Sequence, residues 1–197
     1  MHTSRNIPSI DTYSLLCEAW SDEPGQIDTA WVGYRDWPPA GMRLSTQSVW
    51  SALLASSYFS DPQLGSVVGQ PFTFFFQASN DSIYMAGPVY LFRVIEATPT
   101  LTSPRNGEQV GPRPVLRWNA FTASYPFTLR VTVILTAGEY EAVVWSRDGL
   151  SASPSEVTVS DSLENGSYYW TLHVVDSFEN TSRSKEGLFR VNAEVNL

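Results

Sequence analysis

The chain has 197 residues, 43% of them apolar and 13% aromatic, which is enough apolar material for two cores of ordinary size. Its formal net charge of −8 argues against a basic groove for nucleic acid and against attraction to an anionic membrane surface. The single cysteine, Cys17, excludes an intrachain disulfide framework. Cys17 lies in an apolar run, which predicts a buried and unreactive thiol.

The N-terminal residues lack the apolar segment of a signal peptide, and no apolar run in the chain is long enough to span a bilayer. These features are consistent with a soluble chain, a mature form or a piece of a longer protein. Residues 1–6 are predicted to form a flexible terminus. No insertion into a membrane is expected.

Residues 7–95 are predicted to form a first β-sandwich. Apolar residues alternate from Ile27 to Tyr34, and a second alternating strand contains Trp50, Ala52 and Leu54. The apolar residues of 45–69 follow no clear period over the second half of this stretch. Either a long loop or a short helix around 49–56 is therefore possible.

A third alternating segment runs through Phe72, Phe74, Phe76 and Ala78 and ends in a turn. The uncharged run 72–76 is strongly β-prone and would be exposed to pairing with other chains at a sheet edge. It is therefore expected to be a central strand in a monomer, or a site of strand addition if it lies at an edge.

The tetrapeptide Leu-Phe-Arg-Val occurs twice, at 91–94 and at 188–191, with an offset of 97 residues. A repeat of this length, closing each time in a short strand, predicts two tandem β-sandwich domains. The residues between them, 96–99, form a short linker that ends in proline and restricts how far the two domains can swing.

Residues 100–194 are predicted to form the second β-sandwich. Its short strands are separated by regular turn signals, and no segment has a convincing helical period. The predicted strands begin with 101–103 and continue at 115–118, 127–133, 140–145, 156–159, 168–174 and 189–191.

The order of motifs in the second half resembles the bacterial fibronectin type III-like modules of secreted and cell-surface proteins. The resemblance covers about residues 97–194 and is carried by Leu-Thr-Ser-Pro-Arg-Asn-Gly at 101–107, Leu-Arg-Trp at 116–118, Leu-Glu-Asn-Gly-Ser-Tyr-Tyr-Trp at 163–170 and Phe-Arg-Val at 189–191. The first half is similar in kind to bacterial Ig-like domains. Together these resemblances imply an all-β chain of two tandem antiparallel Ig-like or fibronectin type III-like sandwiches with an extracellular or cell-surface location.

The resemblance also implies roles for particular side chains. Trp118 matches the core anchor of the second strand, and Tyr168 matches the tyrosine that makes a corner hydrogen bond on entering the sixth strand. Three further aromatic residues are expected to be structural anchors: Trp170, Phe189 and Phe92.

No catalytic or cofactor signature is present, and no cofactor is expected. Of the two histidines, His2 lies near the terminus and His173 takes an outward strand position, so a Ser-His-Asp site is disfavoured. One cysteine and two widely separated histidines are too few ligands for a metal site built from imidazole or thiolate groups. Calcium at acidic turns, such as Asp22-Glu23, Asn80-Asp81 and Asp176 with Glu179-Asn180, stays open, although solvated turns explain these residues equally well.

Two tryptophans are the candidate partner-binding residues. Trp31 faces away from the core side of its strand, and Trp37 lies in a loop with two prolines. An exposed tryptophan can anchor a protein partner or stack on a sugar, whereas packing between the domains is the structural alternative.

The sequence is therefore consistent with two functions. The first is a non-catalytic structural or adhesive module pair that acts through protein–protein contact or self-association in a surface or filament assembly. The alternative is a carbohydrate-binding or accessory module of a secreted enzyme.

Overall fold

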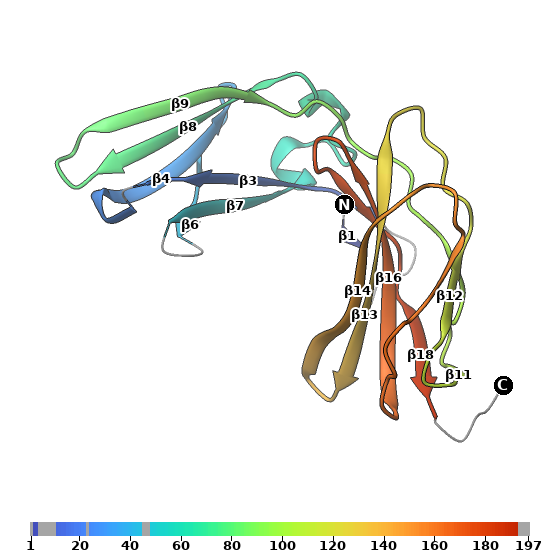
Figure 1. Cartoon of the computed structure of the whole chain (residues 1–197). Helices are drawn as coiled ribbons and strands as arrows, with labels where there is room; N and C mark the ends of the chain where they lie inside the picture. Colours follow the sequence, from blue (N-terminus) through green and yellow to red (C-terminus); the bar gives the residue numbers. More distant parts are fainter. Residues whose placement is uncertain (1, 4–10, 23, 45–47, 193–197) are drawn as a thin grey trace. The chain divides into compact units, whose positions relative to one another are not determined.

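The computed structural model describes residues 2–3, 11–22, 24–44 and 48–192. These residues form β-strands joined by turns and three short 3-10 segments, η1 (Pro24–Gln26), η2 (Ser56–Phe59) and η3 (Gly65–Val67) (Figure 1). The chain divides into an N-terminal unit, Thr12–Val94, and a C-terminal unit, which comprises Ile95–Leu197 and Met1–Asp11. The strands of each unit pair antiparallel, apart from one parallel pair in the C-terminal unit, so the predicted fold class of two tandem all-β sandwiches is confirmed.

The N-terminal unit consists of a three-stranded and a four-stranded sheet. The smaller sheet has the order β3-β7-β6, with bounds Ser14–Trp20, Val49–Ala55 and Arg43–Leu44. The larger sheet has the order β5-β4-β8-β9, with bounds Ala40–Gly41, Ile27–Tyr34, Pro71–Ala78 and Ile83–Tyr90. The Phe-rich strand β8 lies between β4 and β9, as expected for a central strand.

Alternation of side chains along the strands builds the core of the N-terminal unit. Trp50, Ala52 and Leu54 are buried on β7 while Leu53 is exposed, so residues 49–55 form a strand and not the short helix that the sequence left open. Cys17 is buried beside them on β3, and its burial raises the pKa of its thiol to about 12, which makes it unreactive as predicted.

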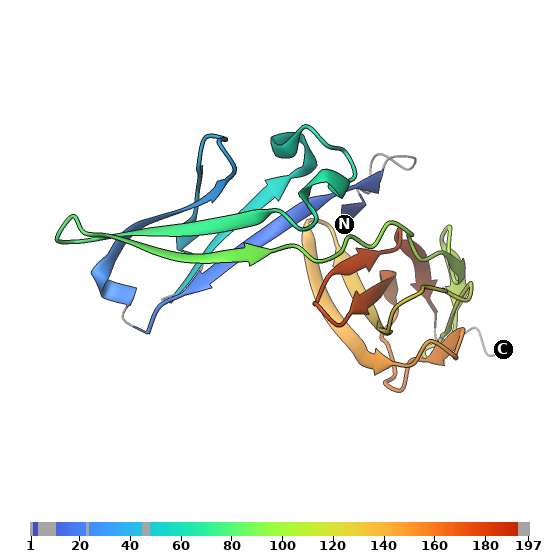
Figure 2. The ribbon, with the colours of Figure 1, turned by 90° about the horizontal axis from the view of Figure 1, so that it is seen from above.

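The C-terminal unit also consists of two sheets, which enclose its core (Figure 2). One sheet has the order β10-β12-β15, with bounds Leu101–Ser103, Val115–Trp118 and Glu156–Thr158. The other has the order β11-β18-β16-β13-β14, with bounds Glu108–Val110, Gly187–Val191, Gly166–Asp176, Phe127–Ala137 and Tyr140–Leu150, and β17 (Thr181–Arg183) also pairs with β16. Two short strands, β1 (His2–Thr3) and β2 (Asp11–Thr12), pair with each other.

Aromatic side chains fill the core of the C-terminal unit. Trp170 is fully buried beside Trp118, and its Nε1 donates a hydrogen bond to the carbonyl oxygen of Pro104 at 2.8 Å. Tyr168 stacks on Phe189 at 5.4 Å between ring centroids. The hydroxyl of Tyr168 donates to the backbone oxygen of Glu164 at 2.8 Å, which is the corner hydrogen bond of immunoglobulin-like sandwiches.

The expected anchor Phe92 requires a correction. Leu188–Val191 belongs to β18, where Phe189 is buried between the sheets, but residues 91–94 follow the end of β9 and belong to no strand. Phe92 is accordingly 63% exposed and is not a core anchor. The two copies of the tetrapeptide therefore do not occupy equivalent places, because only the second has partner strands on both sides.

Candidate protein-contact surface of the N-terminal unit

The outer face of the four-stranded sheet carries a row of apolar side chains. Trp31 on β4 pairs with Phe75 on β8, and Phe75 pairs with Met85 on β9. Side chains of paired residues lie on the same face of a sheet. Because Val32 and Phe74 beside them are buried in the core, Trp31, Phe75 and Met85 face outward.

Trp31 and Phe75 form a stacked pair. Their ring centroids lie 5.7 Å apart and the ring planes are within 9° of parallel. Gly33 makes room for this arrangement, because a Cβ atom at that position would lie 3.1 Å from Cε2 of Phe75. Met85, the third residue of the row, is 72% exposed to solvent. Ile83, on the same strand, is 59% exposed. We call Trp31, Phe75, Met85 and Ile83 the outer apolar face.

Gly33→Ala should displace the Phe75 ring and weaken its stacking on Trp31. The expected loss of stability is about 0.5–1.5 kcal/mol, the energy of one aromatic pair beyond its area burial. Near-ultraviolet circular dichroism and tryptophan fluorescence would report the displaced ring. Gly41→Ala is a matched control, since no atom lies within 4 Å of its added Cβ. Unchanged spectra in Gly33→Ala would contradict the observed packing.

Polar side chains border the outer apolar face. The hydroxyl of Thr29 donates to Oε1 of Gln77 at 3.3 Å, and Nε2 of Gln77 donates to Oδ1 of Asp81 at 3.2 Å. None of the four residues of the outer apolar face is ionisable. An uncharged apolar centre with a polar rim is the usual composition of a protein–protein interface.

Trp37, the second candidate residue, packs within the N-terminal unit. It follows β4 in a turn and is half-buried, with ring contacts to Tyr34 at 6.0 Å and Tyr58 at 5.8 Å. The hydroxyl of Tyr58 donates to the carbonyl oxygen of Pro38 at 2.6 Å and holds this turn in place. The ring contacts of Trp31 and Trp37 involve different partners, so the two tryptophans do not form one site. A partner contact through Trp37 stays a prediction.

Exposed apolar residues that the sequence did not indicate lie on the smaller sheet of the same unit. Trp20 is 74% exposed and Leu16 54% exposed on β3, and Leu53, which pairs with Leu16, is 69% exposed on β7. Alternation along the strand could have predicted this exposure from the sequence, because Leu16 and Trp20 lie on the opposite side of β3 from the buried Cys17.

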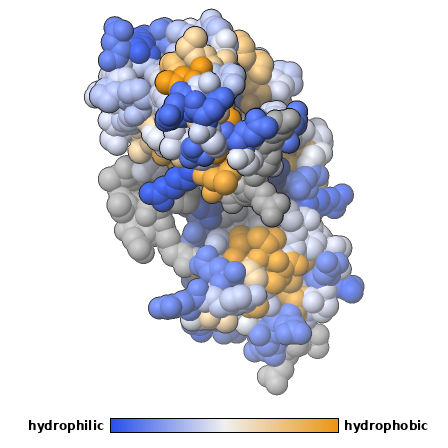
Figure 3. Space-filling view, turned by 90° about the vertical axis from the view of Figure 1, so that its left-hand side faces the viewer, coloured by the Kyte–Doolittle hydropathy of each residue, from blue (hydrophilic) through white to orange (hydrophobic). Residues whose placement is uncertain are grey.

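The C-terminal unit has an exposed apolar face of its own. Figure 3 shows apolar side chains gathered on the face of this unit where β14 lies. On that strand Val143 is 64% exposed and Tyr140 is 63% exposed. The strand also carries Glu141, Arg147 and Asp148, so its surface is mixed and resembles an ordinary solvated edge more closely than the outer apolar face does.

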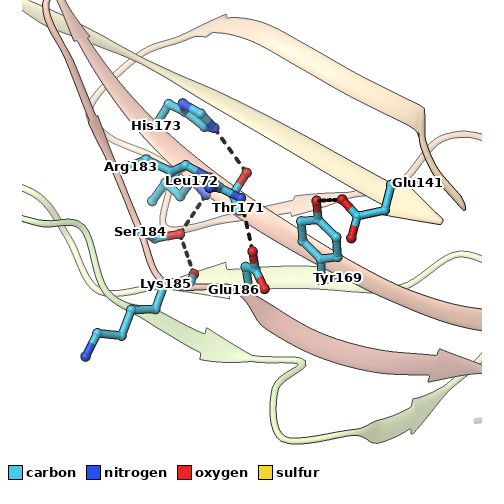
Figure 4. Close-up of polar contacts among 9 residues, drawn as sticks. All are labelled: Glu141, Tyr169, Thr171, Leu172, His173, Arg183, Ser184, Lys185 and Glu186. Carbon is cyan, nitrogen blue, oxygen red and sulfur yellow. Dashed lines mark hydrogen bonds and ion pairs between the residues drawn. The ribbon is translucent and has the colours of Figure 1, made fainter. Parts of the chain in front are cut away.

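In the polar cluster of the C-terminal unit, the hydroxyl group beside His173 is buried (Figure 4). Nε2 of His173 lies 3.1 Å from the hydroxyl of Thr171, but Thr171 is only 1% exposed. The other bonds hold the strands and the following turn: Tyr169 donates to Glu141 at 3.0 Å, the backbone nitrogen of Leu172 donates to Ser184 at 3.0 Å, Ser184 donates to the carbonyl of Lys185 at 2.8 Å, and Arg183 pairs with Glu186 at 3.4 Å.

His173 should make the C-terminal unit less stable in acid. Burial, together with the nearby positive charges of Arg183 and Arg130, lowers its pKa from 6.5 to about 4. Between these two values the unfolded chain binds a proton that the folded chain does not, so the free energy of unfolding falls as the pH falls through this window. In urea denaturation at about pH 7 and about pH 4.5, His173→Gln should lose less stability than the parent protein. An equal loss would contradict a buried neutral imidazole.

Calcium binding at the acidic turns stayed open in the sequence analysis. In the structure, side-chain oxygens of these turns accept hydrogen bonds from within the same turn. The carboxylate of Asp176 accepts bonds from the backbone nitrogens of Phe178 at 2.8 Å and Asn180 at 3.0 Å, and from the side-chain amide of Asn180 at 3.0 Å. Oδ1 of Asn80 accepts the backbone nitrogen of Ser82 at 3.0 Å. Glu23 lies outside the described residues. Within the described ranges, no group of three or more His, Cys, Asp or Glu side chains could hold a metal ion.

The part of the chain that the structure describes contains no helix of sufficient length and hydrophobicity to cross a membrane. No protein-family profile matches the chain, and no curated protein matches it either.

Some solved structures are similar to this chain. The chain is similar to the fibronectin(III)-like modules of Clostridium thermocellum CbhA, with 13% identity, a TM-score of 0.36, and coverage of 93% of this chain and 88% of that one. It is also similar to the FN1-FN3 domains of chicken CNTN1, at 9% identity, TM-score 0.34 and coverage of 83% and 56%. A third similar structure is a beta-1,2-glucanase from Parabacteroides distasonis, at 11% identity and TM-score 0.33, with coverage of 91% of this chain but 28% of that chain. The strand order of the two units, and not these scores, identifies the architecture.

Proposed function

We propose that this chain is a non-catalytic pair of β-sandwich modules in an extracellular or cell-surface assembly, and that it acts through protein–protein contact. The observation that carries the proposal is the outer apolar face, in which Met85 and Ile83 are largely exposed beside the Trp31–Phe75 pair. Contiguous exposed apolar surface is rare on proteins that act alone. The resemblance of residues 97–194 to modules of secreted proteins supports the location.

The partner we propose is a second copy of the chain, joined through the outer apolar face. Each copy carries a net charge of −8, so two copies repel each other over most of their surfaces. At the outer apolar face this repulsion is reduced, because none of its four residues is ionisable. Added salt screens the remaining repulsion but does not weaken the apolar contact. Self-association should therefore strengthen as salt rises.

Sedimentation velocity over a range of protein concentrations tests this proposal. The parent protein should associate, more strongly at about 0.5 M than at about 0.05 M salt. Met85→Ser should stay monomeric while melting at the same temperature, because Met85 is 72% exposed. Val143→Ser, at a position of similar exposure (64%) in the C-terminal unit, is the matched control and should associate like the parent. A parent protein that is monomeric at every concentration would contradict the proposal.

One arrangement favours the second candidate, carbohydrate binding. Trp31 lines a hollow in the surface together with Asp28 and Thr29, and an aromatic ring in a hollow with polar groups can hold a sugar. Against it, the Trp31 and Phe75 rings turn one face toward each other, and this leaves less aromatic surface for a flat platform. A specific signal on a glycan array that Trp31→Ala abolishes, from a protein that stays monomeric, would establish the second candidate instead.

A further inference from the structure

One edge of strand β3 is not paired with any strand that the structure describes. β3 pairs with β7 through seven consecutive residue pairs, from Ser14 with Ala55 to Trp20 with Val49. Among the described residues, no strand pairs with the other edge of β3. Natural edge strands are usually protected by proline, bulges or several charges. β3 contains no proline, pairs with β7 without a bulge, and carries the single charge of Glu18.

Strand β9 of the facing sheet is uncovered on its inner side. Tyr84, Ala86 and Val89 pair with Phe76, Phe74 and Phe72, and Phe74 and Phe72 point into the core. The β9 residues therefore point to the same inner side, because paired residues share a face. All eight residues of β9 are nevertheless exposed. The described strands of the three-stranded sheet thus do not cover β9, and the described residues leave a place for a further strand beside β3.

The C-terminal unit of the same chain shows what fills this place in a complete sandwich. The two units pair their strands in the same way: β12 with β15 corresponds to β3 with β7, β13 with β16 to β4 with β8, and β16 with β18 to β8 with β9. In the C-terminal unit, β10 pairs with the second edge of β12, and β11 runs parallel to β18. In the described part of the N-terminal unit, β10 and β11 have no counterpart.

The edge of β3 that pairs with no described strand and the exposed inner side of β9 together set the requirements for an added strand, in its backbone and in its side chains. A single extended segment fits, with its backbone hydrogen-bonded to β3 and its inward side chains on Tyr84 and Val89. Glu18 is the only charged residue on the two bordering strands. A cation at an outward position of the segment would therefore be complementary to the place.

We propose that the N-terminal unit accepts an extended segment of a partner protein as an added strand beside β3. The segment has apolar residues at alternate inward positions, over β9, and a lysine or arginine at an outward position beside Glu18. This site is separate from the outer apolar face, since Tyr84 and Met85 are neighbours on β9 that point to opposite sides.

A capped peptide, Thr-Val-Thr-Val-Lys-Val-Thr, is the probe, with its binding to the full chain measured by fluorescence anisotropy. The peptide should bind and should increase the protection of the β3 backbone amides from hydrogen exchange. A version N-methylated along its pairing edge should not bind, because it cannot donate the backbone hydrogen bonds.

Three variants separate the elements of the proposal. Glu18→Lys should weaken binding about fivefold, and a peptide with glutamate in place of lysine should restore it. Tyr84→Ser should weaken binding about tenfold or more, through the lost apolar contact. Met85→Ser, on the opposite face, should leave peptide binding unchanged although it abolishes self-association, so failure of this proposal and failure of the proposed function are distinguishable.

Three results would overturn the proposal. The first is no binding of the peptide at millimolar concentration. The second is binding that Met85→Ser abolishes and Tyr84→Ser does not, which would place the peptide on the outer apolar face. The third is binding only after deletion of residues 1–10, which would assign the place to the chain's own N-terminal residues and not to a partner.

Discussion

Trp170→Ala should unfold the C-terminal unit or lower its free energy of unfolding by about 3–5 kcal/mol, the cost of truncating a fully buried aromatic residue in a packed core. Trp170 is 0% exposed, lies beside Trp118 and donates a hydrogen bond to Pro104. The alanine variant would leave both a void and an unpaired buried carbonyl. Urea denaturation followed by tryptophan fluorescence would measure the loss, with the melting of the N-terminal unit expected to stay unchanged.

Phenylalanine variants separate packing from hydrogen bonding at this position. Nε1 of Trp118 is buried and has no hydrogen-bond partner among the described residues, whereas Nε1 of Trp170 is bonded. Trp118→Phe therefore removes ring volume alone. Trp170→Phe also leaves the carbonyl of Pro104 unpaired, which costs about 1–3 kcal/mol more. If Trp118→Phe proved as costly as Trp170→Phe, the assigned hydrogen bond would be wrong.

Phe72→Ala should have the matching effect on the N-terminal unit. Phe72 is 3% exposed, and its ring packs on Tyr34 at 4.9 Å and on Phe59 at 6.1 Å. The expected loss is again about 3–5 kcal/mol. Differential scanning calorimetry should show the transition of this unit moving to lower temperature, while the transition of the C-terminal unit stays in place. Thr73→Ala, the next residue on the same strand, is the control. A shift of both transitions together would contradict two independently folding units.

Strands with strict alternation could be predicted from the sequence, because alternation is a local property. The segments at 27–34, 72–78 and 168–174 all belong to strands, and the core tryptophans Trp50, Trp118 and Trp170 are buried. The repeated tetrapeptide, in contrast, did not mark equivalent strands in the two units. Residues 188–191 lie between β11 and β16, whereas residues 91–94 belong to no strand, and a tetrapeptide alone does not determine which strands lie beside it.

The outer apolar face could be predicted only in part. The outward direction of Trp31 follows from its neighbours Ala30 and Val32, which are buried. Its packing against Phe75 depends on the register of two strands more than 40 residues apart, and no local pattern encodes that register. The sequence does not predict a strand over residues 83–90, because they are uniformly apolar and include Gly87-Pro88. Their exposure depends on which strands lie over them in the facing layer, and no described strand covers them.

The most direct test of the proposed function is a distance between two copies of the outer apolar face. Cys17 is 5% exposed and its thiol pKa is raised to about 12, so a spin label attached to Thr29→Cys, at the rim of that face, would react at one position only. The account predicts strong dipolar coupling between labels on two molecules, lost on dilution with unlabelled protein and lost in Met85→Ser. Coupling that is absent at high protein concentration, or that persists in Met85→Ser, would contradict it.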